Sequence, residues 1–280
     1  MNKKILLTGA TGFVGHHVLK NLISRNLRIS IIVRDDNILL SEEVDKIESI
    51  YFTKNLFTES DDNLYRITEG VDTIIHCAWY TKPSNYLVAT ENLECLEGTV
   101  RLGLIAKKNR VRRFIGIGTC LEYDYSHSLP LEISSPIRPI SQYAKSKNSV
   151  FEQLSSEFED SAIQFTWCRL FYLYGEGENN NRLVPYIHNQ LRSSKEVYIS
   201  NGDYVRDYMK ITDAAELIVN VALSEHIGPV NICSGEAVTV KELAEKISEE
   251  YGMRELLQFR STQNSISEPQ FIVGVPNWKV

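Results

Sequence analysis

The sequence predicts an α/β protein built on a doubly wound parallel sheet. Short and almost continuously apolar runs of strand length alternate with longer stretches of helical periodicity. Strands of this composition are buried on both faces, which requires helices on both sides of a parallel sheet. A glycine-rich turn between the first apolar run and the first amphipathic stretch is a second indication of this class.

The order of the runs gives each element its place. No internal repeat or low-complexity segment interrupts the alternation. The expected strands are residues 4–8, 28–33, 73–77, 113–118, 165–173 and 229–233, and the expected helices are residues 14–26, 91–108, 142–158, 213–223 and 240–251.

Composition excludes several classes of protein. A chain of 280 residues with 43% hydrophobic and 24% charged residues is typical of a globular protein with one large domain, or a core domain and a small lobe. The net charge of −6 argues against nucleic-acid binding, and no run approaches the roughly 20 apolar residues of a membrane span. Five scattered cysteines without a C-x-x-C pair, and an N-terminal apolar run too short for a signal peptide, predict a cytoplasmic protein.

Three glycines follow the first expected strand. Gly9, Gly12 and Gly15 lie between that strand and the first expected helix. Glycines at this point allow a tight turn and the close approach of a pyrophosphate to the helix N-terminus. We therefore expect a Rossmann-type domain that binds a dinucleotide.

The end of the second expected strand decides the choice of dinucleotide. Here the strand runs into Arg34, whose guanidinium suits a 2′-phosphate and favours NADP(H) over NAD(H). Asp35 follows directly, and a tighter turn would let it accept from the ribose hydroxyls of NAD(H) instead.

Tyr143 and Lys147 are spaced four residues apart on an expected helix. This spacing places both side chains on one face, where an ammonium would favour the phenolate and lower its pKa. Taken alone, the pair fits an ordinary amphipathic surface helix better.

The whole set of motifs resembles the extended short-chain dehydrogenase/reductases, the NAD(P)-dependent sugar-nucleotide epimerase/dehydratase family. The resemblance covers nearly the whole chain. It rests on TGATGFVG at 8–15, Asp72 with His76-Cys77-Ala78, Gly118-Thr119, Tyr143-x-x-x-Lys147, Arg169 with Tyr174-Gly175, Arg206-Asp207-Tyr208 with Asp213, and Asn231-Ile232-Cys233-Ser234-Gly235.

The resemblance implies a role for each of these positions. Tyr143 would be the general acid and base, Lys147 would bind the nicotinamide ribose, and Thr119 would hold the substrate oxygen; these three are the expected catalytic residues. The expected cofactor-binding residues are Gly9, Thr11, Gly12, Phe13, Val14, Arg34, Asn55, Leu56, Cys77, Ala78, Lys147 and Phe171.

The substrate implied by the resemblance is a nucleotide-linked sugar. Its diphosphate requires cations, for which Arg182 and Arg206 match family positions. For the aromatic candidates, core packing or a dimer contact is an equally good interpretation. The expected substrate-binding residues are Trp79, Tyr80, Thr81, Thr119, Tyr143, Asn179, Arg182 and Arg206, with Tyr204 and the other asparagines of 179–181 as further polar candidates.

Departures from the family narrow the reaction. Sugar-nucleotide 4,6-dehydratases carry an Asp-Glu pair directly after the Thr, where this chain has Cys120-Leu121; Glu122 is one position late, although a shifted loop would bring it close. Reductases that also epimerise carry a Cys and a His where this chain has Leu121 and Arg182. Hydride transfer at a single carbon remains, by a 4-ketoreductase or a 4-epimerase.

Two further departures concern the cofactor site. Asn55 stands where the family has an Asp that contacts adenine, and its amide would have to be oriented to offer an acceptor. Cys95 stands where the family has an Asn, and Asn92 lies one helical turn away as a possible substitute.

Two stretches interrupt the alternation of strands and helices, namely residues 175–200 and the residues after Gly235. Insertions at the carboxyl ends of late strands build the substrate side of an open α/β sheet. We therefore expect a dinucleotide-binding domain at 1–174, to which 207–234 returns, and a small C-terminal substrate-binding lobe made of 175–206 and 235–280.

Three functional hypotheses follow. The leading one is NADPH-dependent reduction of the 4-keto group of a nucleotide-linked 4-keto-6-deoxyhexose, in deoxysugar or surface-polysaccharide biosynthesis. The second is a sugar-nucleotide 4-epimerase that retains NAD. The third is a non-catalytic dinucleotide-sensing regulator, against which the intact Thr119, Tyr143 and Lys147 argue.

Partners and metals complete the expectations. The family resemblance implies a homodimer in which helices 91–108 and 142–158 form a four-helix bundle. We expect no nucleic-acid, membrane or metal partner, because no cluster of His, Cys and carboxylates has metal spacing. His76 is expected to be a packed structural residue.

Overall fold

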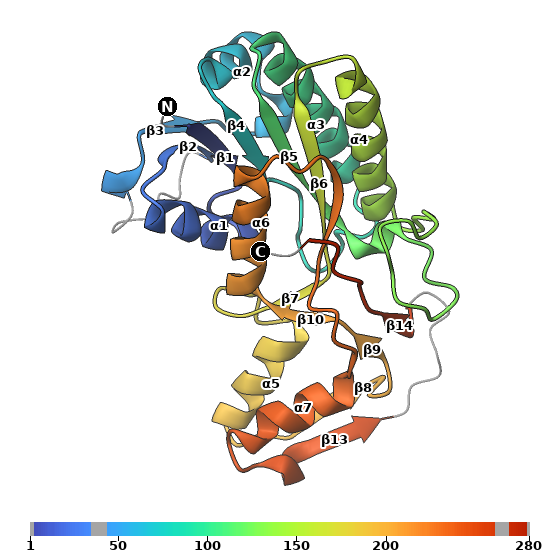
Figure 1. Ribbon diagram of the computed structural model, residues 1–280. Coiled ribbons are helices and arrows are strands. Elements are labelled where there is room, and N and C mark those ends of the chain that lie inside the picture. The colour runs from blue at the N-terminus through green and yellow to red at the C-terminus, as the bar shows by residue number, and fades with distance from the viewer. Residues whose placement is uncertain (1–2, 35–43, 261–268, 279–280) are drawn as a thin grey trace.

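Seven parallel strands form the central sheet (Figure 1). The computed structural model describes residues 3–34, 44–260 and 269–278. The strand order is β3-β2-β1-β4-β5-β6-β11, which confirms the expected Rossmann-type sheet. Its members are β1 (Lys4–Thr8), β2 (Arg28–Val33), β3 (Ser49–Phe52), β4 (Thr73–His76), β5 (Arg113–Thr119), β6 (Gln164–Leu170) and β11 (Gly228–Ile232).

Helices cover both faces of this sheet, as the apolar strands require. On one face α1 (Phe13–Ser24) packs beside α6 (Ile211–Leu223) (Figure 1). On the other lie α2 (Asp61–Thr68), α3 (Glu91–Lys108) and α4 (Gln142–Glu159). No helix in the described part of the chain is long and apolar enough to cross a membrane.

The sheet has its switch point between β1 and β4. The chain moves outwards from β1 to β2 and β3, then returns to the other side of β1 and continues from β4 to β6. Open α/β sheets bind ligands in the crevice at such a point, outside the carboxyl ends of the strands.

The expected strand 165–173 is interrupted. Its first part is β6, and its last residues form β7 (Tyr172–Tyr174), which pairs with β10 (Tyr208–Lys210) outside the central sheet. The amide of Phe171 still donates to Ile232 of β11, whereas the amide of Tyr172 donates to Asp207. The chain leaves the sheet because its hydrogen-bond partner changes at this point.

A smaller part of the molecule lies beyond the carboxyl ends of the strands (Figure 1). Val184, Ile187, Leu243 and Ile247 belong to its own apolar core. Residues on both sides of the expected lobe boundaries contribute to it, and the division into domains stays a prediction. Its elements are α5 (Leu183–Arg192), β8 (Val197–Ser200), β9 (Val205–Arg206), β12 (Val238–Thr239), α7 (Val240–Glu249), β13 (Leu257–Arg260) and β14 (Phe271–Ile272).

Asp207 ties this smaller part to the sheet. Its buried carboxylate accepts hydrogen bonds from the amides of Ser234, Gly235 and Gly274, at 2.8, 2.9 and 3.1 Å. The Ser234 hydroxyl adds a bond of 2.6 Å. One side chain therefore joins three segments that are far apart in the sequence.

Candidate active site

A pocket of about 1030 Å³ opens at the carboxyl ends of the central strands. It reaches from the glycine turn before α1 to β9 and the start of α5. All of the expected cofactor-binding and substrate-binding residues line it except Lys147. Of the further polar candidates, Tyr204 lines the pocket, whereas Asn180 and Asn181 do not. The sequence therefore located the pocket, although the roles of the individual residues stay proposals.

The glycine turn leaves no room for side chains. Gly9 has a φ of +72°, and a Cβ atom on it would lie 2.6 Å from the amide nitrogen of Ala78. A Cβ atom on Gly15 would lie 2.1 Å from the carbonyl oxygen of Gly9. Gly12 caps α1 without a side-chain hydrogen bond. The amides of the first helical turn thus face the pocket, as a pyrophosphate site requires.

The end of the pocket where we expect adenosine carries a cation, Arg34, and an anion, Glu94. Arg34 is exposed on the pocket wall, while Asp35 lies outside the described residues. Asn55 accepts from the amide of Phe57 at 3.0 Å and donates to Glu94 at 2.8 Å. The orientation of its amide is therefore fixed with the carbonyl oxygen already in use, and Glu94 brings a pocket carboxylate that the sequence did not indicate.

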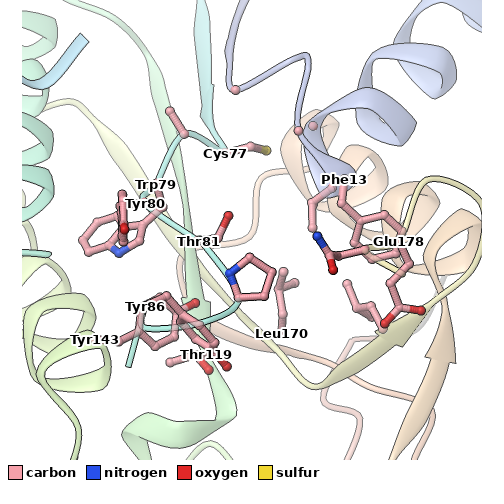
Figure 2. Close-up of a pocket in the computed structure, with 18 of the residues that line it drawn as sticks. Phe13, Cys77, Trp79, Tyr80, Thr81, Tyr86, Thr119, Tyr143, Leu170 and Glu178 are labelled. Carbon is pink, nitrogen blue, oxygen red and sulfur yellow. The ribbon is translucent and has the colours of Figure 1, made fainter. Parts of the chain in front are cut away.

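Thr119 and Tyr143 meet on one wall of the pocket. Figure 2 shows both beside Tyr86. Thr119 ends β5, and its Oγ1 accepts from the amide of Leu121 at 3.3 Å, which leaves its own proton to donate to a ligand. Tyr143 is the second residue of α4, and its amide donates to the carbonyl of Leu87 at 3.1 Å.

Tyr86 is a pocket residue that sequence reasoning missed. Its ring centroid lies 5.1 Å from that of Tyr143, in an edge-on arrangement. It comes from an irregular segment before α3, where no periodicity or motif marks a single tyrosine.

Lys147 lies behind the wall rather than on it. Its side chain is 3% exposed, and its Nζ donates to the carbonyl of Ile117 at 2.6 Å. The Trp79 ring covers it, with the centroid 3.7 Å from Nζ. The Tyr143 ring centroid is 5.8 Å away.

Burial dominates the titration of both residues. It lowers the pKa of Lys147 to about 7 and raises the pKa of Tyr143 above its ordinary value. The expectation that the lysine lowers the pKa of the tyrosine is not met in this arrangement. The physical reason is that removing either charged form from water costs more than their mutual attraction returns.

Trp79 does not simply line a hexose pocket. Besides covering Lys147, its Nε1 donates to Asn92 at 2.8 Å. Asn92 is fully buried and donates in turn to the carbonyls of Tyr86 and Ala89. Asn92 therefore does not substitute at the pocket for the family's asparagine; Cys95 lines that position instead.

Glu122 turns away from the pocket. It is fully buried and accepts from Arg169 Nε at 2.7 Å and from the amide of Thr119 at 2.8 Å. Both oxygens also receive Trp167 Nε1 at 3.1 Å. Burial raises the pKa of Glu122, while the Arg169 guanidinium counteracts that rise. The shifted loop that would have made it a dehydration carboxylate is absent.

Cys120 is the residue that follows Thr119. It lines the pocket, and burial raises the pKa of its thiol to about 12. The thiol is therefore neutral near pH 7 and is a poor base.

His76 confirms the structural interpretation. It is buried at the end of β4, and its two ring nitrogens lie 2.9 Å from the hydroxyls of Thr8 and Thr99. Both nitrogens are in use, so this histidine is part of the core.

The end of the pocket where we expect the substrate is aromatic and basic. Arg206 is buried between the rings of Tyr172 and Tyr204, 5.2 and 5.1 Å from their centroids. Its Nη1 donates to the carbonyls of Val205 and Gln270. Arg182 is exposed, and its guanidinium lies 5.8 Å from the Tyr86 ring.

Two polar groups in this part lack partners among the described residues. The buried Tyr204 hydroxyl is one, and Oε2 of Glu178 is the other. Burial raises the pKa of Glu178 to about 7. Figure 2 shows Glu178 beside Phe13, across the pocket from Thr119 and Tyr143. No sequence pattern indicated Glu178 beyond its place next to the polar run 179–181.

The side chains that commonly bind metal ions can be compared in the part of the chain that the structure describes. Within residues 3–34, 44–260 and 269–278, no three His, Cys, Asp or Glu side chains are placed to hold one ion.

Comparison with known proteins gives the same family as the motifs. The model of the NAD dependent epimerase/dehydratase family matches residues 5–233. Among curated proteins, the chain is 22% identical to dTDP-6-deoxy-L-talose 4-dehydrogenase (NAD(+)) of Aggregatibacter actinomycetemcomitans, over 89% of this chain and 91% of that protein. It is 25% identical to human dTDP-D-glucose 4,6-dehydratase, over 98% of this chain and 79% of that protein.

A solved structure confirms the fold. UDP-N-acetylglucosamine 4-epimerase of Methanobrevibacter ruminantium M1 superposes with a TM-score of 0.84 at 20% identity. The match covers 99% of this chain and 90% of that one.

Proposed function

Because the chain belongs to the NAD dependent epimerase/dehydratase family and is an enzyme of that oxidoreductase class, we propose that it reduces a nucleotide-linked 4-keto-6-deoxyhexose at C4 with NADPH. Its product would serve deoxysugar or surface-polysaccharide biosynthesis. One observation carries the proposal: the Thr119 and Tyr143 hydroxyls face the pocket, while the neighbouring carboxylate of Glu122 is held in a buried ion pair with Arg169. Tyr143 offers the acid and Thr119 the hydrogen-bond donor, while Cys120 and Leu121 stand where 4,6-dehydratases carry their Asp-Glu pair.

The chain's own residues supply the proton. When bound, a dinucleotide would supply the hydride for the carbonyl carbon. Tyr143 donates its proton to the carbonyl oxygen, which the Thr119 hydroxyl holds, and water then reprotonates the tyrosine. A raised pKa keeps the proton on Tyr143 at neutral pH, which is the form that a reduction uses.

The glycine turn and Arg34 support the choice of cofactor. The first-turn amides of α1 would hold the pyrophosphate, and Phe171, Cys77 and Ala78 line the nicotinamide side. The exposed guanidinium of Arg34 at the end of β2 suits the 2′-phosphate of NADP(H). The dehydrogenase from A. actinomycetemcomitans is named for NAD(+). The preference for NADP(H) therefore rests on Arg34 and not on this relative.

A 4-epimerase is the second candidate. Oxidation and re-reduction at C4 would use the same Thr119 and Tyr143 and would need no further carboxylate. Such an enzyme regenerates its dinucleotide in every cycle and retains it.

The homodimer through α3 and α4 also stays a proposal. These helices lie side by side on one face of the sheet (Figure 1), and Leu93 on α3 is 49% exposed. Sedimentation of the wild type beside Leu93→Glu would test it, with a shift to monomer expected in the variant.

A direct assay separates the two catalytic candidates. Purified protein is mixed with NADPH or NADH and a nucleotide-linked 4-keto-6-deoxyglucose, and the absorbance of the reduced nicotinamide is followed. Stoichiometric loss that is faster with NADPH supports the reductase. No loss with any nucleotide, together with NAD that copurifies with the protein, would replace it by the epimerase.

A further inference from the structure

Trp79 separates Lys147 from the pocket. Trp79 lines the pocket and Lys147 does not, and the centre of the Trp79 ring lies 3.7 Å from Lys147 Nζ. A ligand that approaches this ammonium across the Trp79 ring would therefore have to take the place of the indole.

The indole is held by defined contacts. Its Nε1 donates to Asn92 at 2.8 Å, and its ring packs edge-on against Phe57 and Tyr143 with centroids 6.4 Å apart. Asn92 is itself fixed by the carbonyls of Tyr86 and Ala89 at 2.7 and 2.8 Å. The cover is thus a specific conformation with interactions that have to be broken.

The ammonium of Lys147 is poorly satisfied under this cover. It has three donors, and among the residues described its one hydrogen bond goes to Ile117. Burial is the largest influence on its pKa and lowers it to about 7. Cys95 on α3, Glu122 on η3 (Cys120–Glu122) and Cys77, directly after β4, act in the opposite direction. A pair of hydroxyl oxygens would be better acceptors than an indole face.

We propose that Trp79 is a positioning residue that controls access of the dinucleotide to Lys147. The indole occupies the face of the ammonium that the ribose hydroxyls of the dinucleotide take, so binding displaces it. The inference rests on the proposed function, together with the ribose-binding role that the family resemblance implies for Lys147. It adds to dinucleotide binding a free-energy cost that Trp79 and Asn92 set.

The cost appears in the affinity for the dinucleotide. A protein whose competent state is only partly populated binds more weakly in proportion to that population. Loss of one cation–π contact should therefore tighten binding roughly twofold to thirtyfold. Phenylalanine keeps a weaker aromatic face and leucine keeps none, so the affinities should rank Trp79→Leu tightest, then Trp79→Phe, then wild type.

Binding of NADP+ and NAD+ without sugar substrate provides the test. Dissociation constants are measured by calorimetry for the wild type, Trp79→Phe, Trp79→Leu and Asn92→Leu, with Trp278→Phe as the matched control. Trp278 does not line the pocket, so its variant should bind like the wild type. Tighter binding in all three cover variants supports the proposal, whereas weaker or unchanged binding in folded Trp79 variants overturns it, because an indole that stacks on the ligand would give that result.

A second measurement uses the unaltered cover. Acrylamide quenching of tryptophan fluorescence is compared with and without saturating NADP+ in the Trp278→Phe protein, where only Trp79 and Trp167 remain. Displacement of Trp79 should change its accessibility, and identical quenching would overturn the proposal even if the Trp79 variants fail to fold. Binding of neither dinucleotide would overturn both proposals, but a missing reductase activity with the predicted order of affinities would overturn only the proposed function.

Discussion

Arg169 and Lys147 are two buried cations on neighbouring elements, and their partners differ. Arg169 is 2% exposed and reaches the Glu122 carboxylate at 2.7 Å and the Tyr123 hydroxyl at 3.1 Å. Lys147 is 3% exposed, with one backbone carbonyl and the face of Trp79. A buried charge with a full set of partners fixes structure, whereas one with few partners keeps its capacity to bind something else.

The largest expected effect is that of a substitution at Tyr143, which lies beside Lys147 on α4. Tyr143→Phe removes the proposed proton donor, which the Thr119 hydroxyl cannot replace, so turnover should fall about 10²–10⁴-fold. Dinucleotide affinity should stay close to that of the wild type. Steady-state assays and calorimetry measure the two effects.

Tyr86→Phe is the control for that variant, because its ring lies beside Tyr143 on the same wall. It should retain most activity. Equal losses in the two variants would contradict the assignment of the acid to Tyr143.

Loss of the well-partnered cation should have the next largest effect. Arg169→Met leaves Glu122 buried without its counter-charge, which should lower the free energy of unfolding by about 3–5 kcal/mol. Urea denaturation measures it. Arg254→Met breaks an exposed ion pair with Glu245 and should cost no more than about 1 kcal/mol. Similar losses in both variants would refute the structural role of the buried pair.

The same substitution at the poorly partnered cation should have the opposite sign. Lys147→Met should raise the free energy of unfolding by about 2–4 kcal/mol at pH 7, because burial lowers the folded-state pKa of this lysine to about 7 from 10.5. Between those two values the unfolded chain binds more protons, so the wild type gains stability from this group as the pH rises. The difference between variant and wild type should therefore shrink from pH 7 to pH 10. A destabilised Lys147→Met, or a constant difference, would contradict it.

Arg34 extends the comparison to an exposed cation on the pocket wall. Arg34→Ala should weaken NADPH binding about tenfold, the value of one charge-assisted contact, and leave NADH binding almost unchanged. Lys54→Ala provides the control, since Lys54 is an exposed cation on the same end of the pocket. Equal effects of Arg34→Ala on both dinucleotides would overturn the preference for NADP(H).

Local patterns predicted most of the central sheet and the pocket. The glycine turn could be predicted because its turn, helix start and phosphate site lie within a few residues of each other. The interruption of the strand after Leu170 could not, since it depends on the carbonyl of Asp207, which is far away in the sequence. The short strands of the smaller part were missed for the same reason.

Side-chain contacts were harder to predict than positions. Trp79 was correctly placed at the pocket. Its contact with Lys147 joins the loop after β4 to α4, two segments far apart in the sequence, and such a contact depends on tertiary packing. Glu122 lies three residues after Thr119, one of the expected catalytic residues, and only Arg169 and Trp167 on β6 show that its carboxylate points away from the pocket. Sequence spacing therefore predicts where a residue lies, but it does not predict whether its side chain faces the pocket or the protein core.

The hydrogen bonds of the Asp207 carboxylate also constrain the order in which the chain can fold during synthesis. Its partners Ser234, Gly235 and Gly274 follow it by 27, 28 and 67 residues, so these bonds can form only after the intervening chain has been synthesised. The glycine turn and the first strands can form early from local contacts. The smaller part of the molecule lacks the hydrogen bond from Gly274 to Asp207 until Gly274 has left the ribosome. A nascent chain stalled before that point should already hold a dinucleotide site, and should lack the wall against which a sugar would be bound.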